Sequence, residues 1–256
     1  MHAEPRPRRL LTLVCVVLSA TMLSGCAMLG DAVDEVSRTF AGEPRTNGVD
    51  ELPARKVVDR AREAAKSAPS VRVAGELVSA EGPLRVDMRF QGSEGATGRL
   101  TQGGESIEVL RVGRDLYLKG NKGFYRSVRA GDAAELLEGK YLRVPAQGGE
   151  FAGLAALTRV DTLIDAALPD TGKFSMAESE WVRDTYAIGV RVREADEGGV
   201  LFVSLEGKPY PLQIASLDGS EAAGSIDFLD YGRQVSLEKP AKGEVVDLDQ
   251  LLERAS

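Results

Sequence analysis

The residues best suited to nucleophilic or metal chemistry all lie among the first 26 positions of this 256-residue chain. His2 is the one histidine, and Cys15 and Cys26 are the two cysteines. Histidine triads, Cys–His pairs, zinc sites and internal disulfides all depend on such residues. If the N-terminal segment is a cleaved signal, the mature chain keeps Cys26 alone. None of these sites could then form, and no metal or other cofactor is expected.

The segment that ends at Cys26 has the features of a bacterial lipoprotein signal peptide. Three arginines within residues 1–9 precede an apolar run over 10–23, which is shorter than the roughly 20 apolar residues that cross a bilayer. The run ends in Leu23-Ser24-Gly25-Cys26, which resembles the lipobox. In a lipobox, small residues enter a peptidase cleft and the cysteine thiol accepts a diacylglycerol. We predict a signal peptide at 1–25 and lipidation of Cys26; the alternative is an ordinary signal or transmembrane helix with a chance cysteine.

A lipidated cysteine would hold the mature chain at the cell membrane, lipid-anchored on the extracytoplasmic face. Residues 1–25 carry three arginines and one glutamate, so their loss changes the formal charge from −7 to about −9. Such an acidic chain lacks the basic face that binds nucleic acid, and nucleic acid is not an expected partner. Residues 26–51 contain few large apolar side chains and are predicted to form a tether.

Beyond the tether, apolar residues recur first at helical and then at alternate positions. Helical spacing predicts an amphipathic helix over 53–67 and a more apolar helix over 151–168. Residues 124–126 are predicted to continue a strand, and short helices are predicted at 133–137 and 248–254. Period-two alternation between glycine turns predicts the antiparallel strands, at 71–79, 84–90, 97–102, 107–112, 116–119, 141–144, 174–182, 185–193, 200–205, 210–217 and 224–229.

This order of elements predicts an α+β fold built on one strongly curved antiparallel sheet of about nine or ten strands. The central helices would cover the concave face of the sheet. Residues 52–256 would then form a single β/α domain around one core. Two stacked strand-rich halves would satisfy the same spacing, so that alternative stays open.

Several short motifs follow one another in order over most of residues 52–246. They are Ser70–Gly75 after the first helix, Arg114–Gly120, Lys140–Pro145 and Phe228–Gly232. Together with the lipobox, they resemble the LppX/LprAFG family of actinobacterial lipoproteins, whose fold is similar to LolA and LolB. The resemblance implies a half-open β-barrel in which helices cover an apolar cavity. It also implies that the cavity binds acyl chains of a lipid or lipoglycan, which the protein carries within the cell envelope.

Aliphatic side chains at the inward positions of these elements are the candidate ligand contacts. A lipid carrier needs a curved sheet, inward apolar residues and a cover over them, and it needs no catalytic group. The same side chains would equally fill a solid core. The candidate lipid-binding residues are Val86, Met88, Phe90, Leu154, Leu157, Leu163, Ile164, Ile188, Val190, Leu212 and Ile214.

The sequence offers little support for catalysis. The acidic pairs Asp227 with Asp230 and Glu178 with Glu180 are typical of solvated surface segments, and the glycine-rich turns lack nucleotide-binding spacing. We therefore predict a protein without enzymatic activity. A lipid carrier is the leading hypothesis. The alternatives are an interaction or sensory module that binds an envelope transporter or sensor protein, and a passive envelope lipoprotein.

Overall fold

The computed structural model divides the chain into two units, Met1–Pro44 and Arg45–Ser256. The residues that it describes are 46–79, 82–127, 137–145, 151–194, 197–216 and 224–248, all in the second unit. The predicted signal peptide, Cys26 and most of the predicted tether lie outside these ranges. So do the short helices predicted at 133–137 and 248–254, apart from Leu137 and Leu248.

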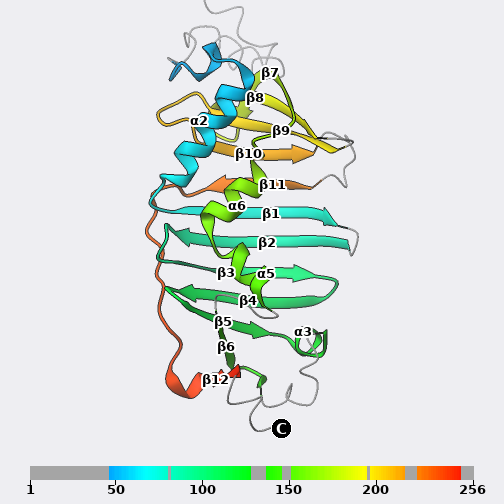
Figure 1. The fold of residues 1–256 in the computed structure, drawn as a ribbon, viewed down its shortest axis with the longest axis vertical. Helices are drawn as coiled ribbons and strands as arrows, with labels where there is room; N and C mark the ends of the chain where they lie inside the picture. The colour runs from blue at the N-terminus through cyan, green and yellow to red at the C-terminus, as the bar shows by residue number, and fades with distance from the viewer. Residues whose placement is uncertain are drawn as a thin grey trace, which may run out of the picture. The chain divides into compact units, whose positions relative to one another are not determined.

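One curved sheet of twelve strands dominates the second unit (Figure 1). Its strands lie in the order β12-β6-β5-β4-β3-β2-β1-β11-β10-β9-β8-β7. The described pairs are antiparallel except for β12 with β6. The strands are β1 (Val71–Ser79), β2 (Gly82–Gln91), β3 (Gly95–Gln102), β4 (Glu105–Val112), β5 (Asp115–Gly120), β6 (Tyr141–Pro145), β7 (Lys173–Val182), β8 (Thr185–Glu194), β9 (Glu197–Ser204), β10 (Pro211–Ser216), β11 (Ser225–Leu229) and β12 (Val245–Asp247).

Two local meanders, β1 to β6 and β7 to β11, are joined into this sheet by the pairing of β1 with β11. Arg72 lies opposite Leu229, and Val73 lies opposite Phe228. The alternative of two stacked halves is therefore wrong. The sheet does not close, because β12 and β7 are its two edges. The eleven predicted strand ranges correspond to β1 to β11, so the estimate of nine or ten strands in the sheet was too low. Strand β12 was not predicted, because its three residues are too few to show alternation.

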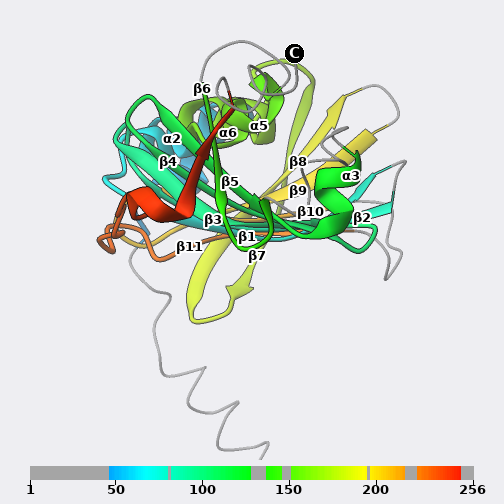
Figure 2. The same cartoon turned by 90° about the horizontal axis from the view of Figure 1, so that it is seen from below.

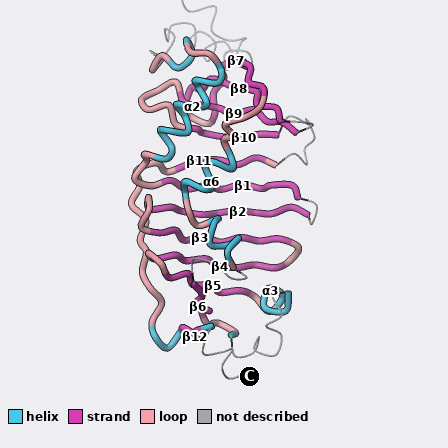
Figure 3. Tube along the Cα trace, in the orientation of Figure 1, coloured by secondary structure: helices cyan, strands magenta, loops and turns pink. Residues whose placement is uncertain are grey.

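Three helices, α2 (Ala54–Lys66), α5 (Ala152–Leu157) and α6 (Val160–Ala167), lie across one face of the sheet (Figure 3), on the inner side of its curve (Figure 2). The short α3 (Lys122–Ser127) packs beside β4 and β5, and the 3-10 turns are η1 (Val49–Glu51) and η3 (Lys242–Glu244). The position of α5 and α6 follows from the topology. Because β6 lies near one edge of the sheet and β7 forms the other edge, the chain between them must cross the face.

Helix α2 confirms the amphipathic helix predicted over 53–67. Its buried side chains, Val57, Val58, Ala61, Ala64 and Ala65, recur at the spacing of one helical face. Pro53 directly precedes the first turn, where a missing N–H costs no hydrogen bond. The buried face of α2 packs toward β7 to β10 and α6.

Two sequence predictions fail in the connection between the meanders. Residues 124–126 belong to α3 instead of a strand, because the Asn121 side chain accepts a hydrogen bond from the Phe124 amide at 3.0 Å and so starts a helical turn. The helix predicted over 151–168 is broken into α5 and α6 at Thr158 and Arg159. The Thr158 hydroxyl donates back to the Ala155 carbonyl, and the Thr158 carbonyl accepts from Arg111 instead of continuing the helix.

Alternation along the strands separates a buried inner face from a charged outer face. On β2, Met88 and Phe90 are buried in the core, whereas Arg85 points outward and is exposed. The outer charges form cross-strand pairs: Arg72 binds both oxygens of Asp87 at 2.9 and 2.8 Å, and Arg85 binds Glu76 at 2.7 Å. The hydrogen bond from Arg72 lowers the pKa of Asp87. The prediction that the outer face of β2 contacts water is confirmed.

A second, smaller apolar cluster lies on the outer face of β8 to β10. Val182, Ala187 and Phe202 form its buried part, and Leu212 packs against them. A bulge between Met176 and Ser179 bends β7, and the β7–β8 hairpin turns toward this face (Figure 2).

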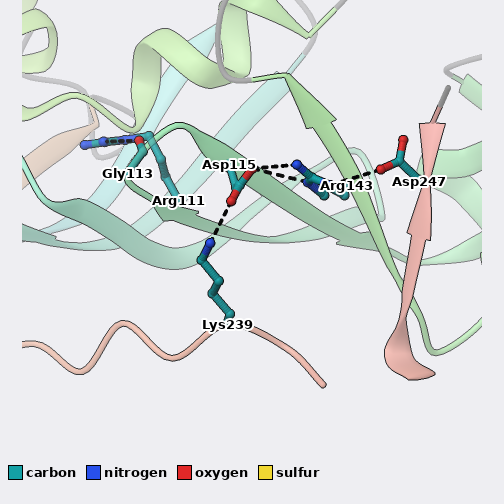
Figure 4. Close-up of polar contacts among 6 residues, drawn as sticks. All are labelled: Arg111, Gly113, Asp115, Arg143, Lys239 and Asp247. Carbon is teal, nitrogen blue, oxygen red and sulfur yellow. Dashed lines mark hydrogen bonds and ion pairs between the residues drawn. The ribbon is translucent and has the colours of Figure 1, made fainter. Parts of the chain in front are cut away.

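The C-terminal segment after β11 returns to the β6 edge of the sheet and ends in β12 (Figure 1). A charge cluster fastens it there (Figure 4). Asp115 of β5 accepts from Lys239 Nζ at 2.7 Å and from Arg143 at 3.0 and 3.2 Å. Arg143 also donates to Asp247 of β12 at 3.2 Å. Residues 124 positions apart in the chain are thereby held together.

Acid is expected to weaken this cluster. The hydrogen bonds from Lys239 and then Arg143 lower the pKa of Asp115 below its ordinary value. Its stabilisation is therefore fully present above the unfolded pKa of about 3.9 and is lost as pH falls through the lower folded pKa. We expect Asp115→Asn to reduce the free energy of unfolding by about 1 kcal/mol at pH 7, and by much less at pH 2. Urea unfolding at both pH values measures this. Asp184→Asn, in an exposed turn, is the control, and an equal loss at both pH values would contradict the prediction.

Candidate functional site

An apolar cavity of about 550 Å³ lies between the concave face of the sheet and the helices that cross it. Its floor comes from inward side chains of seven strands, β1, β2, β3, β8, β9, β10 and β11. On β2 the lining residues Leu84, Val86 and Met88 alternate, as residues on one face of a strand do. On β9 and β10 the lining includes consecutive residues, Gly198 with Gly199 and residues 214–216, so alternation explains only part of the floor. The floor residues are Val73, Leu84, Val86, Met88, Leu100, Val192, Gly198, Gly199, Leu201, Ile214, Ala215, Ser216, Gly224 and Ile226.

The other side of the cavity is formed by residues 157–169, which we call the roof. It contributes Leu157, Thr162, Leu163, Ala166, Ala167, Leu168 and Pro169. Among the described residues that line the floor and the roof, none is ionisable, and Thr162 and Ser216 supply the side-chain hydroxyls. These two residues are exposed, as are Leu157 and Ala166, so they mark where the cavity meets solvent.

Small side chains explain why this part of the interior is hollow. Ala166 and Ala167 face the cavity from α6, and Gly198 and Gly199 face it from β9. Elsewhere under the helices, large side chains fill the space: Phe90, Ile164 and Val190 are 0 % exposed. The interior is therefore packed solid beside an apolar hollow.

Arginine side chains hold the roof at the C-terminal ends of both its helices. Arg111 points inward from β4, is 8 % exposed, and donates to the Thr158 carbonyl at 3.2 and 3.1 Å. Its remaining nitrogen donates to the Gly113 carbonyl at 3.1 Å (Figure 4) and to the Ser93 carbonyl at 3.3 Å. Burial, and secondly the nearby Arg159, lower the pKa of Arg111. A cation at a helix C-terminus also interacts favourably with the helix dipole.

Helix α2 supplies the second anchor. Arg62 donates to the Leu168 carbonyl through Nε at 2.9 Å and through Nη2. Lys66 pairs with Asp165 of α6 at 2.5 Å. The roof is thus tied to β4 at one end and to α2 at the other.

The sequence-predicted contacts divide into three groups in the structure. Val86, Met88, Leu157, Leu163 and Ile214 line the cavity. Phe90, Leu154, Ile164, Ile188 and Val190 belong to the packed core around it. Leu212 lies in the outer-face cluster, because the bulge between Pro211 and Gln213 reverses the direction expected from strict alternation.

The residues that the sequence reasoning missed are mostly small or lie in the roof. The alanines of α6 and the glycines of β9 would have been found only by treating small residues, instead of bulky ones, as the sign of a hollow. Arg111 was also missed. Its position, two after Val109 and four after Ile107 in one strand, is the signal that could have placed it on the inner face.

A larger hollow of about 940 Å³ lies on the outer face, beside the C-terminal segment. It is open and lined by the paired charges, including Arg85 with Glu76 and Arg99 with Glu108 at 2.5 Å. Cross-strand neutralisation leaves this surface without a concentrated charge of either sign. This outer hollow lacks the apolar lining of the cavity on the concave side.

The arrangement offers no sign of catalytic chemistry within the described ranges. Ser236 and Lys239 have the Ser-x-x-Lys spacing of some acyl-transferring enzymes. The Ser236 hydroxyl donates to Glu238 at 3.1 Å, however, while Lys239 is engaged by Asp115. Among the described residues, no three His, Cys, Asp or Glu side chains are grouped to hold a metal ion. No described helix is both long enough and apolar enough for a membrane crossing.

Comparisons with other proteins found similarity in structure alone. No family model and no curated protein matches the sequence. The chain is similar to LprF from Mycobacterium bovis (14 % identity, 73 % of this chain, 97 % of LprF, TM-score 0.48). The LppX/LprAFG family, which this sequence resembles, takes part of its name from LprF. A putative outer membrane lipoprotein-sorting protein domain from Vibrio parahaemolyticus shows 10 % identity over 73 % of this chain and 95 % of that domain, with a TM-score of 0.29. MucB, in its complex with MucA, shows 16 % identity over 74 % of this chain and 58 % of MucB, with a TM-score of 0.34. All these TM-scores are below 0.5, so function is inferred from the geometry of this chain.

Proposed function

We propose that this protein binds the acyl part of a lipid or lipoglycan in the cavity and carries it within the cell envelope. The observation that carries the proposal is a partly open hollow of about 550 Å³ whose described lining residues include no ionisable side chain. Ligand pockets of roughly 300–1,000 Å³ with mostly apolar walls are typical of small-molecule sites. Burial of apolar ligand surface there would supply the binding free energy.

The proposed fold is a half-open, LolA-like β-barrel in which the roof acts as the cover of the ligand site. The curved, unclosed sheet and its helices on one face support this description. We propose no catalytic step. The described part of the cavity wall offers the hydroxyls of Thr162 and Ser216, and it includes no general acid, base or charged electrophile.

Saturable lipid binding tests the proposal directly. The protein carrying Cys26→Ser, stripped of co-purified lipid, is expected to bind a fluorescent long-chain fatty acid with a defined stoichiometry. Fluorescence titration measures it, and native mass spectrometry of the untreated protein identifies any lipid it already carries. Partition of the probe without saturation would contradict the proposal. Partner capture from envelope fractions, for a transporter or a sensor protein, would then become the next experiment.

We also propose that lipidation of Cys26 anchors the mature chain to the membrane through a tether that begins there. Two or three acyl chains are enough for stable attachment. Cys26→Ser is therefore expected to move most of the protein from the membrane to the soluble fraction of bacterial cells. Fractionation with radiolabelled palmitate measures both location and label. Unchanged membrane association of the unlabelled variant would favour an uncleaved apolar segment instead.

A further inference from the structure

The size of the cavity sets how much lipid can enter it. A methylene group takes up about as much room as a water molecule, about 30 Å³. A hollow of about 550 Å³ therefore holds about 18 methylene groups. Two chains of ordinary membrane-lipid length would need about twice that space. We infer that the cavity takes one acyl chain per protein, so that the ligand is a single-chain lipid of about 16 to 18 carbons; this inference rests on the function proposed above.

The walls leave little room for the cavity to widen. Phe90, Ile164 and Val190 are completely buried beside it, and displacing such side chains in a close-packed interior costs free energy. The roof is held by Arg111 at the end of α5 and by Arg62 at the end of α6. Its anchoring carbonyls would lose buried hydrogen bonds if the roof lifted. The packed core and the anchored roof therefore resist widening of the hollow.

The lining also defines which part of the lipid enters. None of the described lining residues is charged, so a charged head group among them would be desolvated without a partner. The Thr162 and Ser216 hydroxyls lie on exposed residues at the boundary with solvent. A head group that stays outside could hydrogen-bond to them. The ligand class is thus a lipid with one long chain and a polar head that remains in water.

A chain-length series tests the capacity. The full chain carrying Cys26→Ser competes a fluorescent fatty acid with saturated lysophosphatidylcholines of 10 to 22 carbons, below their micelle concentrations. Each added methylene is expected to raise affinity about fourfold until about 16 to 18 carbons, after which the affinity stays flat. Native mass spectrometry is expected to find one lysolipid per protein. Phosphatidylcholine with two chains of 16 carbons is expected to bind at least about tenfold more weakly than its single-chain counterpart, since its second chain stays outside.

A matched pair of variants links the plateau to this cavity. Ala167→Leu adds three carbons to a roof residue that lines the hollow, so the plateau should move down by about three carbons. Ala152→Leu makes the same change at an exposed position of α5 outside the lining and should leave the plateau in place.

The possible results distinguish the single-chain inference from the proposed lipid-binding function. Equal or tighter binding of the two-chain lipid, two lysolipids per protein, or affinity that still rises at 22 carbons would overturn the single-chain inference and leave lipid binding intact. An unmoved plateau in Ala167→Leu would overturn the assignment to this cavity. Failure of both lipid classes to bind would overturn the proposed function itself.

Discussion

Val86→Trp is expected to lower acyl-lipid affinity about 60-fold while the domain stays folded. Val86 projects from β2 into the cavity and is only half-buried, so the larger ring has space to occupy. If the indole displaces about three methylene groups of the ligand, at about 0.8 kcal/mol each, the loss is about 2.4 kcal/mol. That corresponds to about 60-fold in the dissociation constant. Fluorescence titration with a long-chain fatty acid measures the affinity, and urea unfolding measures the free energy of unfolding.

Two neighbouring substitutions show whether the effect belongs to the cavity. Arg85→Trp adds the same ring to the next residue of β2, on the exposed outer face, and should leave lipid affinity unchanged. Val190→Trp places the ring in the packed core, where Val190 is completely buried, and should cost several kcal/mol of stability. Full affinity in Val86→Trp would exclude the cavity as the site. Unfolding of Val86→Trp to the same extent as Val190→Trp would mean that the hollow is not open space in solution.

Arg111→Met is expected to reduce the free energy of unfolding by about 2 to 4 kcal/mol. The methionine keeps most of the apolar stem but removes all the donors. The Thr158 carbonyl, on a completely buried residue, would lose both of its hydrogen bonds from Arg111, and an unsatisfied buried carbonyl costs about 1 to 3 kcal/mol. The carbonyls of Ser93 and Gly113 belong to exposed residues and can turn to water. Urea unfolding measures the loss.

Arg99→Met is the control for this substitution. Arg99 lies on the outer face of β3 and pairs with Glu108 on the surface, so its loss should cost at most about 1 kcal/mol. Hydrogen exchange gives a second readout, because α5 should exchange faster in Arg111→Met than in Arg99→Met. Equal stability of the two variants would show that Arg111 does not fix the roof.

Sequence periodicity predicted most of the elements. The strands of both meanders and the helix α2 follow from alternation and helical spacing, because each has one face buried and one face in water. The predictions failed where a specific hydrogen bond overrode the pattern. Asn121 starts a helix within a run that otherwise looks extended, and Thr158 interrupts a long apolar helix because its carbonyl bonds to a distant arginine. Neither contact can be read from spacing alone.

The cavity was harder to predict than the fold. Val86, Met88, Leu157, Leu163 and Ile214 were found because they are apolar and face inward. Phe90 and Val190 satisfy the same criterion and yet fill the core. Periodicity gives the direction of a side chain but not whether an atom lies opposite it. That second property depends on which residues from distant elements come together, such as Gly199 of β9 and Ala166 of α6, which line the same hollow.

The central seam of the sheet, between β1 and β11, has a consequence for how the protein folds. Arg72 and Leu229, which lie opposite each other there, are 157 positions apart in the chain. The two meanders can form from local contacts, whereas the seam must close a very long loop, and such non-local pairing slows folding. During synthesis, β1 is made long before β11 exists, so its second edge stays unpaired until almost the whole chain is available. Unpaired strand edges invite aggregation. The interval before this seam closes is therefore when the protein most needs a chaperone.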